Sequence, residues 1–481
     1  MAQYTMESPF MLQNLPGFPY ISYTNQQDTY AILENWYQGS YLNEYTIDKQ
    51  TGKKIEKYPL KINPIRATCE KHASALFGQM LDSIHCGAIP VRILADTSDV
   101  KEVDINKDST EIVERALKEV FADNGAGSMF MSNGILSQYL RGCVFAASWL
   151  PKEKRILITN PSPKEFFGIP KGADFWNLSK AWIIREIDKE VAETYDVVIN
   201  QADTKFYYIE YWDEKNYEVT INGKVINDDD GNPMKDENPW GRVPVTYIPH
   251  IRTNTFLGVS MVTEMVKGLV RELNLRWADI GDAVNDDSHQ PVFMRNVRGK
   301  IDIKHIEGRP IIDLGAASGL AAGEQQPDMD SVSIKSASEV TINLGKELFT
   351  MYRREVAHPA VADGEDTGSQ RSSLTLGVKM WPMVAHVEME RMNWTVGLGN
   401  FCNILLNMMM VKERYGITEE HVKTKLKIVW APMLPQDRKT LVDEVAIRSS
   451  SKLGSQEHLM TLLGDIPNVE EEKAKILAEK E

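Results

Sequence analysis

Apolar residues recur at helical spacing in three long segments of the second half of the chain. The first segment begins at Ser260, a residue that can cap a helix, and runs to about Asp286. The second spans residues 337–357, and the third starts at Ser372 or at Pro382, because proline either begins a helix or kinks it. The third segment ends near Arg414. Steps of three and four predict one apolar stripe on each helix: Val262, Val266, Leu269, Leu273, Trp277, Ile280 and Val284; Val340, Leu344, Leu348 and Met351; and Val384, Val387, Trp394, Leu398, Phe401, Leu405 and Met408.

The first half of the chain mixes the two hydrophobic periods. Helical spacing predicts helices over residues 28–40, 65–81, 108–123 and 129–141, with a strand over residues 89–94. Apolar and β-branched runs then predict strands over residues 143–150, 155–160, 180–188, 205–213, 217–226 and 243–248. Asn222-Gly223 is a strong hairpin signal. The fold class that follows is α+β.

The remaining segments of the second half are shorter. A Gly- and Pro-rich stretch between the first two long helices contains predicted strands at residues 291–295 and 310–314, and residues 425–430 predict another strand. Two small helices near the end are predicted to start after Asp437 and Ser455, and a last turn at Asn468 with Glu471 is predicted to form a capping box.

Charge and composition narrow the function classes. The chain has 481 residues, with 54 Lys and Arg against 68 Asp and Glu, a formal charge of −14, and no basic block. Tight DNA binding releases counterions through clustered basic side chains, so the sequence favours DNA only as a transient neighbour. No apolar run approaches the roughly 20 residues of a membrane helix, and the first residues lack a signal-peptide pattern. A soluble intracellular protein is expected.

Motifs that carry chemistry are missing from the sequence. Phosphate-binding GxxxxGK[ST], HExxH and GxSxG patterns do not occur, the four cysteines are scattered, and the nine histidines include no helical i,i+4 pair. Asp228-Asp229-Asp230-Gly231 with Glu237 imitates a calcium loop, but Ile226 would occupy the first ligand position, which favours a solvated turn. We therefore expect no catalytic residues, no metal and no cofactor.

Several segments resemble the portal proteins of tailed bacteriophages. The segment from Asn63-Pro64-Ile65 to Phe77-Gly78 is similar to the early helix of that family, and Gly142–Ala146 to one of its strands. Leu257-Gly258-Val259-Ser260 running into Leu269–Leu275 resembles the entry to its first stem helix. Pro435-Gln436-Asp437, Gly454-Ser455-Gln456-Glu457 and the Glu-rich end follow one another as the C-terminal helices of such proteins do.

This resemblance implies a portal-type α+β fold with named parts. They are a wing (1–256, with a return strand at 425–432), two stem helices (257–286 and 336–357), a clip (287–335), a tunnel loop (358–371), a spine helix (372–414) and a crown (433–481). The resemblance also implies a ring of about twelve subunits at one capsid vertex of the virion, assembled in the host cytoplasm. The implied partners are the terminase large subunit, a head–tail adaptor, the major capsid and scaffold proteins, and transient non-specific double-stranded DNA, with no membrane.

Polar faces of the stem helices and the loop are the predicted lining of a DNA channel. The candidates are Glu264, Lys267, Arg271, Asp279 and Asp282 on the first stem helix, Lys346, Arg353 and Arg354 on the second, and Asp363, Glu365, Asp366, Gln370 and Arg371 in the loop. A predominantly acidic lining would let DNA slide, and a few basic residues would slow its slippage. Deleting residues 363–369 is expected to spare ring assembly and to impair packaging or retention of DNA.

Two other interpretations remain open at this point. The chain can be an intracellular α+β enzyme with a helical appendage, which requires a convergent cluster of titratable groups in the folded protein. It can also be another capsid or connector assembly protein, although such connectors are usually shorter. A ring of high mass with a central hole distinguishes the portal interpretation from the enzyme interpretation.

Overall fold

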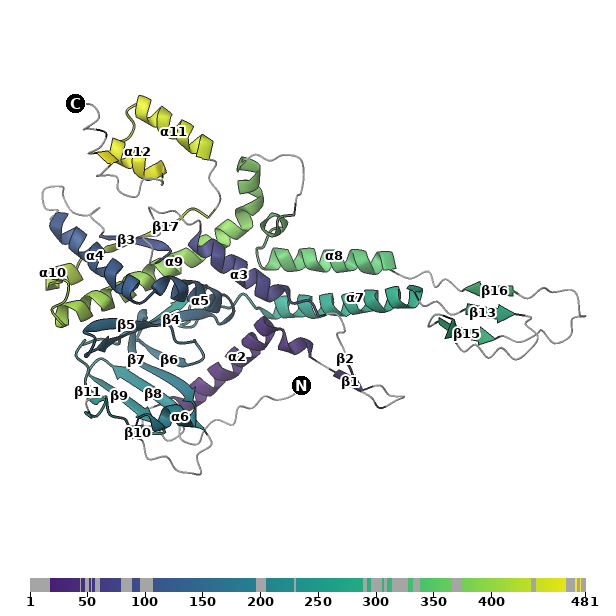
Figure 1. The fold of residues 1–481 in the computed structure, drawn as a ribbon, viewed down its shortest axis with the longest axis horizontal. Helices are drawn as coiled ribbons and strands as arrows, with labels where there is room; N and C mark the ends of the chain where they lie inside the picture. Colours follow the sequence, from purple (N-terminus) through teal and green to yellow (C-terminus); the bar gives the residue numbers. More distant parts are fainter. Residues whose placement is uncertain are drawn as a thin grey trace, which may run out of the picture. The chain divides into compact units, whose positions relative to one another are not determined.

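The computed structural model of the chain divides into two compact units, which are described separately (Figure 1). Unit 1 comprises residues 1–37, 65–262 and 357–481, and unit 2 comprises residues 38–64 and 263–356. Both units combine helices and sheets, as the predicted α+β class requires. The structure describes residues 18–43, 45–47, 52, 54–56, 61–78, 89–95, 107–195, 205–228, 231–288, 292–295, 305–306, 309–313, 328–331, 338–365, 373–433, 438–463, 472–473 and 476.

Helices make up much of unit 1, and most of them match the predicted segments. The segment 20–38 is longer than the predicted helix at 28–40, and the short helix α6 lies in a polar stretch with no helical periodicity. The bounds are α2 (Tyr20–Gln38), α3 (Pro64–Phe77), α4 (Lys107–Asp123), α5 (Ala126–Tyr139), α6 (Lys189–Glu193), η3 (Ala360–Asp363), α9 (Ser373–Val411), α10 (Glu419–Val422), α11 (Arg438–Ser450) and α12 (Gln456–Leu463).

Three antiparallel sheets complete unit 1. The largest has the order β10-β9-β8-β7-β6, with β11 also paired to β9; the second has the order β12-β4-β5, and the third pairs β17 with β3. The bounds are β3 (Val91–Ala95), β4 (Gly142–Leu150), β5 (Arg155–Thr159), β6 (Phe166–Lys171), β7 (Asp174–Ile187), β8 (Phe206–Asp213), β9 (Asn216–Ile221), β10 (Lys224–Val225), β11 (Lys235–Glu237), β12 (Val245–Pro249) and β17 (Leu426–Trp430).

The predicted hairpin at Asn222-Gly223 is confirmed. The two residues have φ angles of 49° and 78°, the left-handed values that a two-residue hairpin turn requires, and they join β9 to β10. Strand β6 was not predicted, because Gly168 and Pro170 interrupt its apolar pattern. Its pairing with β7 shifts register on both sides of Pro170, where a β-bulge accommodates the ring.

Helix α9 forms the centre of the core of unit 1. Trp394, Leu398, Phe401, Leu405 and Met408 are fully buried, so the predicted stripe is confirmed over this half of the helix. The helix contacts β12, β4, β17 and α4, and these elements cover it on several sides. Met409 is buried as well, so the methionine run packs into a core rather than forming an exposed binding groove.

The start of α9 resolves the two possibilities left open for Pro382. The helix begins at Ser373 and contains Pro382 within it, and Figure 1 shows that it bends along its course. A proline inside a helix removes one backbone hydrogen bond and clashes with the preceding turn, which accounts for a bend rather than a start.

Length and apolar composition alone would allow α9 to cross a membrane. The segment Leu376–Val411 meets that test, but 56% of its apolar window is buried inside the folded chain. Burial of this kind is what the core helix of a globular protein shows. No uninterrupted apolar run of membrane length occurs in this segment, because polar residues such as Arg391 break it.

Arg391 interrupts the apolar stripe of α9, and hydrogen bonds compensate its buried charge. Its guanidinium donates hydrogen bonds to the carbonyls of Leu76, at 2.9 Å, and Ala431, at 2.8 Å, and it lies over the ring of Trp430. Leu76 is in the last turn of α3, where carbonyls lack helical partners. The buried cation therefore ties the end of α3 to α9.

Cysteines in the described part of the chain are ordinary buried thiols, as predicted. Cys69, Cys143 and Cys402 are free and buried, while Cys86 lies outside the described residues. The predicted cap at Asp437 and the predicted capping box at Asn468 also lie outside them. The calcium-like segment is a turn in which Asp228 Oδ1 accepts a hydrogen bond from the amide of Asn232 at 2.8 Å.

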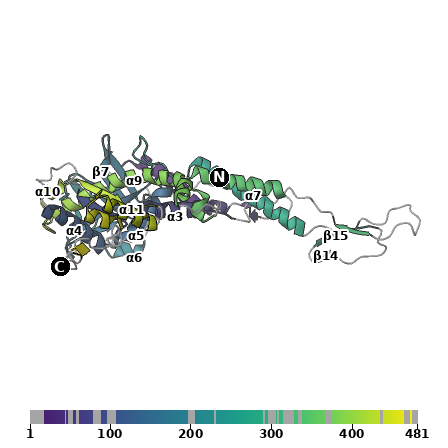
Figure 2. The same cartoon turned by 90° about the horizontal axis from the view of Figure 1, so that it is seen from above.

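Unit 2 is built on two helices that lie side by side as an antiparallel pair, α7 (Glu264–Ser288) and α8 (Ser338–Glu355) (Figures 1 and 2). Between them in sequence is a sheet of order β14-β15-β13-β16, in which β13 and β15 are parallel. The other elements are η1 (Ser40–Leu42), β1 (Tyr45–Ile47), β2 (Lys54–Glu56), β13 (Val292–Arg295), β14 (His305–Ile306), β15 (Arg309–Asp313) and β16 (Asp328–Ser331).

A buried asparagine links two distant parts of unit 2. Asn274 of α7 is fully buried, and its amide donates to the carbonyl of Ile62 at 2.9 Å and accepts from the amide of Ile62 at 2.8 Å. The side chain thus pairs with the backbone as a neighbouring strand would. This contact places Ile62 beside α7, an association that the hydrophobic pattern did not reveal.

Thr263, and not Ser260, caps helix α7. The amide of Val266 donates to Thr263 Oγ1 at 3.2 Å, which is the usual bond of a helix N-cap. Ser260 instead donates to the carbonyl of Tyr139 at 2.8 Å and accepts from the amide of Val262. The predicted start was therefore one turn early, because Ser260 serves the backbone of unit 1.

Two glycines of α9 give a matched test of how closely this helix packs on β12. A Cβ at Gly397 would lie 2.5 Å from Ile248 Cγ1, whereas nothing lies within 4 Å of one at Gly399. We expect Gly397→Ala to destabilise unit 1 by about 1–3 kcal/mol through overpacking. Gly399→Ala should instead stabilise it by about 0.5–1 kcal/mol through helix propensity. Urea unfolding of both variants measures the difference, and equal effects would contradict the close contact between α9 and β12.

Candidate functional site

The predicted channel residues of α7 lie on the exposed side of that helix. Glu264, Arg271, Asp279 and Asp282 are exposed. The opposite side, which includes Val266, Leu273 and Ile280, is buried, as the apolar stripe predicts. One residue of the predicted stripe, Val284, is 54% exposed. Helix α7 therefore has a buried apolar side and an exposed charged side.

Ion pairs partly neutralise the charged side of α7. Lys267 Nζ lies 2.6 Å from Glu264 Oε1, and the Lys267 side chain is only 13% exposed. Arg276, which the sequence analysis did not single out, lies 2.6 Å from Glu272 and 2.7 Å from Asp279. Exposed pairs of this kind contribute little stability, but they reduce the net field that a passing polyanion would meet.

Helix α8 carries its candidate residues on a different edge from its exposed apolar residues. Lys346 and Arg354 are exposed, and the guanidinium of Arg353 lies 4.3 Å from the ring centroid of Phe349. The side facing inward includes Tyr352 and Val356, which are 1% and 2% exposed. Because one side of α8 is buried, the cationic groups on its other sides lie at the surface.

The predicted apolar stripe of α8 is mainly an exposed edge. Val340, Leu344 and Met351 are 74%, 44% and 50% exposed. Spacings of four and seven residues place the three side chains on one edge of the helix. The predicted periodicity is therefore present, and its apolar side chains are exposed in the single chain. This edge is an apolar strip without cover among the described residues, and we call it the α8 edge.

Two of the five loop candidates, Asp363 and Glu365, belong to the described residues. Asp363 accepts a hydrogen bond from Lys71 Nζ and lies 2.9 Å from His358 Nε2. Burial acts to raise the pKa of Asp363, but bonds from Lys71 and His358 outweigh it and lower the pKa to about 2. Glu365 is exposed, and Asp366, Gln370 and Arg371 lie outside the described residues.

Charge is balanced across the described candidates. Five are acidic (Glu264, Asp279, Asp282, Asp363 and Glu365), and five are basic (Lys267, Arg271, Lys346, Arg353 and Arg354). The expected acidic excess is therefore not a property of this set. Among the basic candidates, Lys267 forms an ion pair with Glu264 at 2.6 Å.

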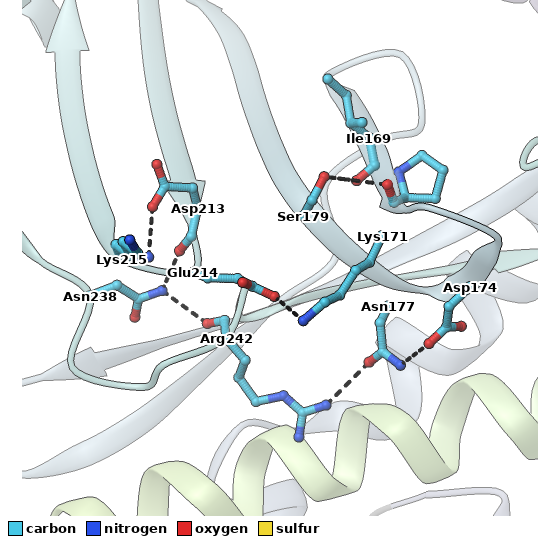
Figure 3. A network of polar contacts seen from close by, with 11 residues as sticks. Ile169, Lys171, Asp174, Asn177, Ser179, Asp213, Glu214, Lys215, Asn238 and Arg242 are labelled. Carbon is cyan, nitrogen blue, oxygen red and sulfur yellow. Dashed lines mark hydrogen bonds and ion pairs between the residues drawn. The ribbon is translucent and has the colours of Figure 1, made fainter.

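A polar pocket of about 380 Å³ opens in unit 1 between the large sheet and α9 (Figure 3). Lys171 Nζ lies 2.5 Å from Glu214 Oε1 in this pocket. Asn177 donates to Asp174 at 2.6 Å and accepts from Arg242 at 3.4 Å. Burial lowers the pKa of Arg242. These groups bind one another and hold the loops at the sheet edge.

The same pocket provides no arrangement for acid–base or nucleophilic catalysis. Its described lining contains no histidine or cysteine, and its carboxylates are held by amide and ammonium donors. A catalytic site needs a base within reach of a nucleophile or of a substrate proton. The convergent cluster that the enzyme interpretation requires is therefore not present in this pocket.

Sequence reasoning missed one cluster that the structure brings together. His72, His250 and His386 lie near one another and near the buried carboxylate of Glu390 in unit 1, and His358 lies beside His72. The histidines are far apart in sequence and form no i,i+4 pair among themselves. One signal was available, because His386 and Glu390 are separated by four residues and so share a helix face.

Comparison with known families identifies the class of protein. A family model described as "Phage portal protein, SPP1 Gp6-like" matches residues 151–481, more than half of the chain. The chain therefore belongs to the phage portal protein family. The proteins of this family are structural and non-enzymatic. A search of curated proteins gives no match.

The matched region contains only some of the segments on which the predicted resemblance rested. Residues 257–275 and the C-terminal helices lie within it, whereas residues 63–78 and 142–146 precede it. The family assignment is confirmed. The similarity of the two earlier segments remains a prediction.

Proposed function

We propose that about twelve copies of this chain form a ring at one capsid vertex, and that double-stranded DNA passes through the ring during packaging and ejection. Membership of the portal family supports this function in general. The exposed α8 edge is the structural observation that best supports the formation of a ring. Three exposed apolar side chains on one edge of a helix need a partner, and further copies of the same chain are the partner that a ring supplies.

The balanced charge of α7 and α8 supports the proposed contact with DNA. A duplex that must move through a ring has to be neither gripped nor repelled strongly. Arg271, Lys346 and Arg354 are exposed cations that can contact phosphates, while Glu264 and Asp282 prevent a continuous basic track. Few counterions would be released at any one position, so binding would be weak and independent of sequence.

The division into named parts is proposed in the same way. Helices α7 and α8 would form the stem, with β13–β16 as the clip, α9 as the spine, and α11 and α12 as the crown. Unit 1 from residue 65 to residue 256, with β17, would form most of the wing. In this arrangement the clip would dock the terminase large subunit and later the head–tail adaptor, while the major capsid and scaffold proteins surround the ring in the virion.

The α8 edge provides a direct test of ring formation. We expect Leu344→Asp to prevent assembly, because burial of a leucine contributes about 1.5–3 kcal/mol at each subunit contact and a buried carboxylate opposes it. Light scattering measures the result, since twelve copies of the 54.5 kDa chain give 12 × 54.5 = 654 kDa. Val191→Asp is the control, because Val191 and Leu344 are both 44% exposed.

The stability of the single chain should distinguish assembly from misfolding in that experiment. Both substitutions are at exposed positions, so circular dichroism should show the same fold for both variants. A Leu344→Asp chain that forms rings of full mass would contradict the role of the α8 edge. A wild-type chain that remains monomeric at high concentration, in the presence of scaffold protein, would contradict the ring itself.

The loop after η3 provides a second test, in which the deletion has to start after Asp363. Because Lys71 and His358 bind Asp363, a deletion that includes it would damage unit 1 as well as the loop. Deleting residues 366–370 avoids this contact. We expect assembled particles with this deletion to contain rings of normal mass but to package or retain less DNA.

A matched control isolates the loop from simple shortening of the chain. Replacing residues 366–370 with five Gly and Ser residues keeps the length and removes the side chains. Measuring nuclease-protected DNA per particle for both variants tests whether length or side chains matter. Wild-type packaging and retention by the deletion variant would rule out a role for this segment in DNA handling.

A further inference from the structure

Unit 1 contains a buried cluster of imidazoles around one carboxylate. His72, His250 and Glu390 are completely buried, and the side chain of His386 is 15% exposed. His72 belongs to α3, His250 follows β12, and His386 and Glu390 are one turn apart on α9. Three elements from distant parts of the sequence therefore present nitrogen and oxygen donors to one place.

Distances within the cluster suit a single ion. One donor atom each from His72, His386 and Glu390 can be chosen so that all lie within 4.8 Å of one another. His386 Nε2 is 3.3 Å from Glu390 Oε1, and His250 Nδ1 is 3.6 Å from Glu390 Oε2. Ligands of a tetrahedral ion with metal–ligand distances of about 2.0–2.2 Å lie at comparable separations.

These donors lack hydrogen-bond partners inside the protein. Neither ring nitrogen of His72 or of His250 has one among the described residues, nor has His386 Nε2 or Glu390 Oε1. Each buried polar group left unpaired costs about 1–3 kcal/mol. So many such atoms in one buried place need a common partner.

The nearest permanent cation does not fill this role. Arg391 adjoins Glu390 in sequence, but its guanidinium is bound to the carbonyls of Leu76 and Ala431 and lies 3.3 Å from Glu388. A fully buried carboxylate requires a compensating positive charge. An ion held by the imidazoles supplies that charge where no Lys or Arg of the described chain does.

Surrounding residues hold the donors in position. Gln138 Nε2 donates to Glu390 Oε2 at 2.6 Å and so orients the carboxylate. The backbone of His250 is fixed on both sides, since its amide donates to the carbonyl of Arg141 at 3.0 Å and its carbonyl accepts from Asn393 at 2.9 Å. Such outer contacts are typical of metal sites built into a fold.

We propose that His72, His386 and Glu390 bind one divalent transition-metal ion of the zinc type. Imidazole nitrogen and a single carboxylate favour Zn²⁺ over Mg²⁺ or Ca²⁺, which take oxygen ligands. The site is buried and its ligands come from two helices, so its role is structural: the ion clamps α3 and α9 together. This proposal does not depend on the channel function.

The wild-type chain alone can decide whether the site exists. Untagged full-length protein is dialysed against a chelator, then titrated with Zn²⁺ or with Co²⁺ as a spectroscopic probe. We expect one ion per chain by elemental analysis, the visible bands of tetrahedral Co²⁺ that disappear on adding Zn²⁺, and a melting temperature that rises with metal concentration. Absence of stoichiometric binding and of any metal-dependent melting shift would overturn the proposal.

Variants then assign the ligands. His386→Gln and Glu390→Gln should each weaken Zn²⁺ binding by about 100-fold or more, and Gln138→Ala by about 10–100-fold, as removal of an outer contact does. His421→Gln is the matched control, because His421 is also buried but belongs to α10, outside the cluster. Wild-type affinity in His386→Gln and Glu390→Gln would exclude these ligands even if binding elsewhere persisted.

Discussion

Burial of α9 is the constraint around which unit 1 is organised. A helix that is apolar on most sides cannot rest against one sheet with its other side in water, so other elements must cover it. Trp394, Leu398 and Phe401 have no exposed surface, and β12, β4, β17 and α4 all contact the helix. Strand β17 follows α9 in sequence and pairs with β3, which comes from the first hundred residues. The core therefore forms only when distant parts of the chain meet on this helix.

The same constraint explains why the polar residues of α9 have such different surroundings. Arg391 lies in the buried stripe and is accommodated by carbonyls at the end of α3 and beyond β17. Glu390, one residue earlier, accepts a hydrogen bond from Gln138 and has imidazole nitrogens of His250 and His386 at 3.6 and 3.3 Å from its oxygens. A buried carboxylate without a firmly bound positive charge is costly. Coordination of an ion would offset that cost and link α3 to α9.

Much of the fold follows from hydrophobic periodicity, and the errors have identifiable physical causes. Helices α4, α5, α7, α8 and α9 were predictable because each has a sustained helical repeat. Strand β6 was missed because Gly168 and Pro170 disrupt its alternation, and the contact of Ile62 with Asn274 was missed because backbone pairing by one side chain leaves no pattern. Periodicity identifies an apolar edge without saying what covers it, and the α8 edge is exposed in the single chain.

The contacts of the candidate site residues were harder to predict from the sequence than the fold was. Exposed charges on α7 were predictable because they occur opposite an apolar stripe, but the pairing of Asp363 with Lys71 joins residues 292 positions apart. The four histidines are equally scattered, and only the spacing of His386 and Glu390 was visible in sequence. A residue whose role depends on neighbours from three or more elements can be identified in the folded structure but not from the sequence pattern alone.

Stability should consequently depend on assembly in different ways for the two units. Unit 1 contains large buried clusters, and its folding depends on contacts within one chain. In unit 2, α8 leaves Val340, Leu344 and Met351 exposed, so part of its apolar surface gains cover only from other molecules. Binding that favours the folded form stabilises it in proportion to the logarithm of partner concentration. If ring formation covers the α8 edge, protein concentration should raise the stability of unit 2 more than that of unit 1. A portal subunit built in this way can fold its core before it meets its neighbours and complete its helix pair when it joins the ring.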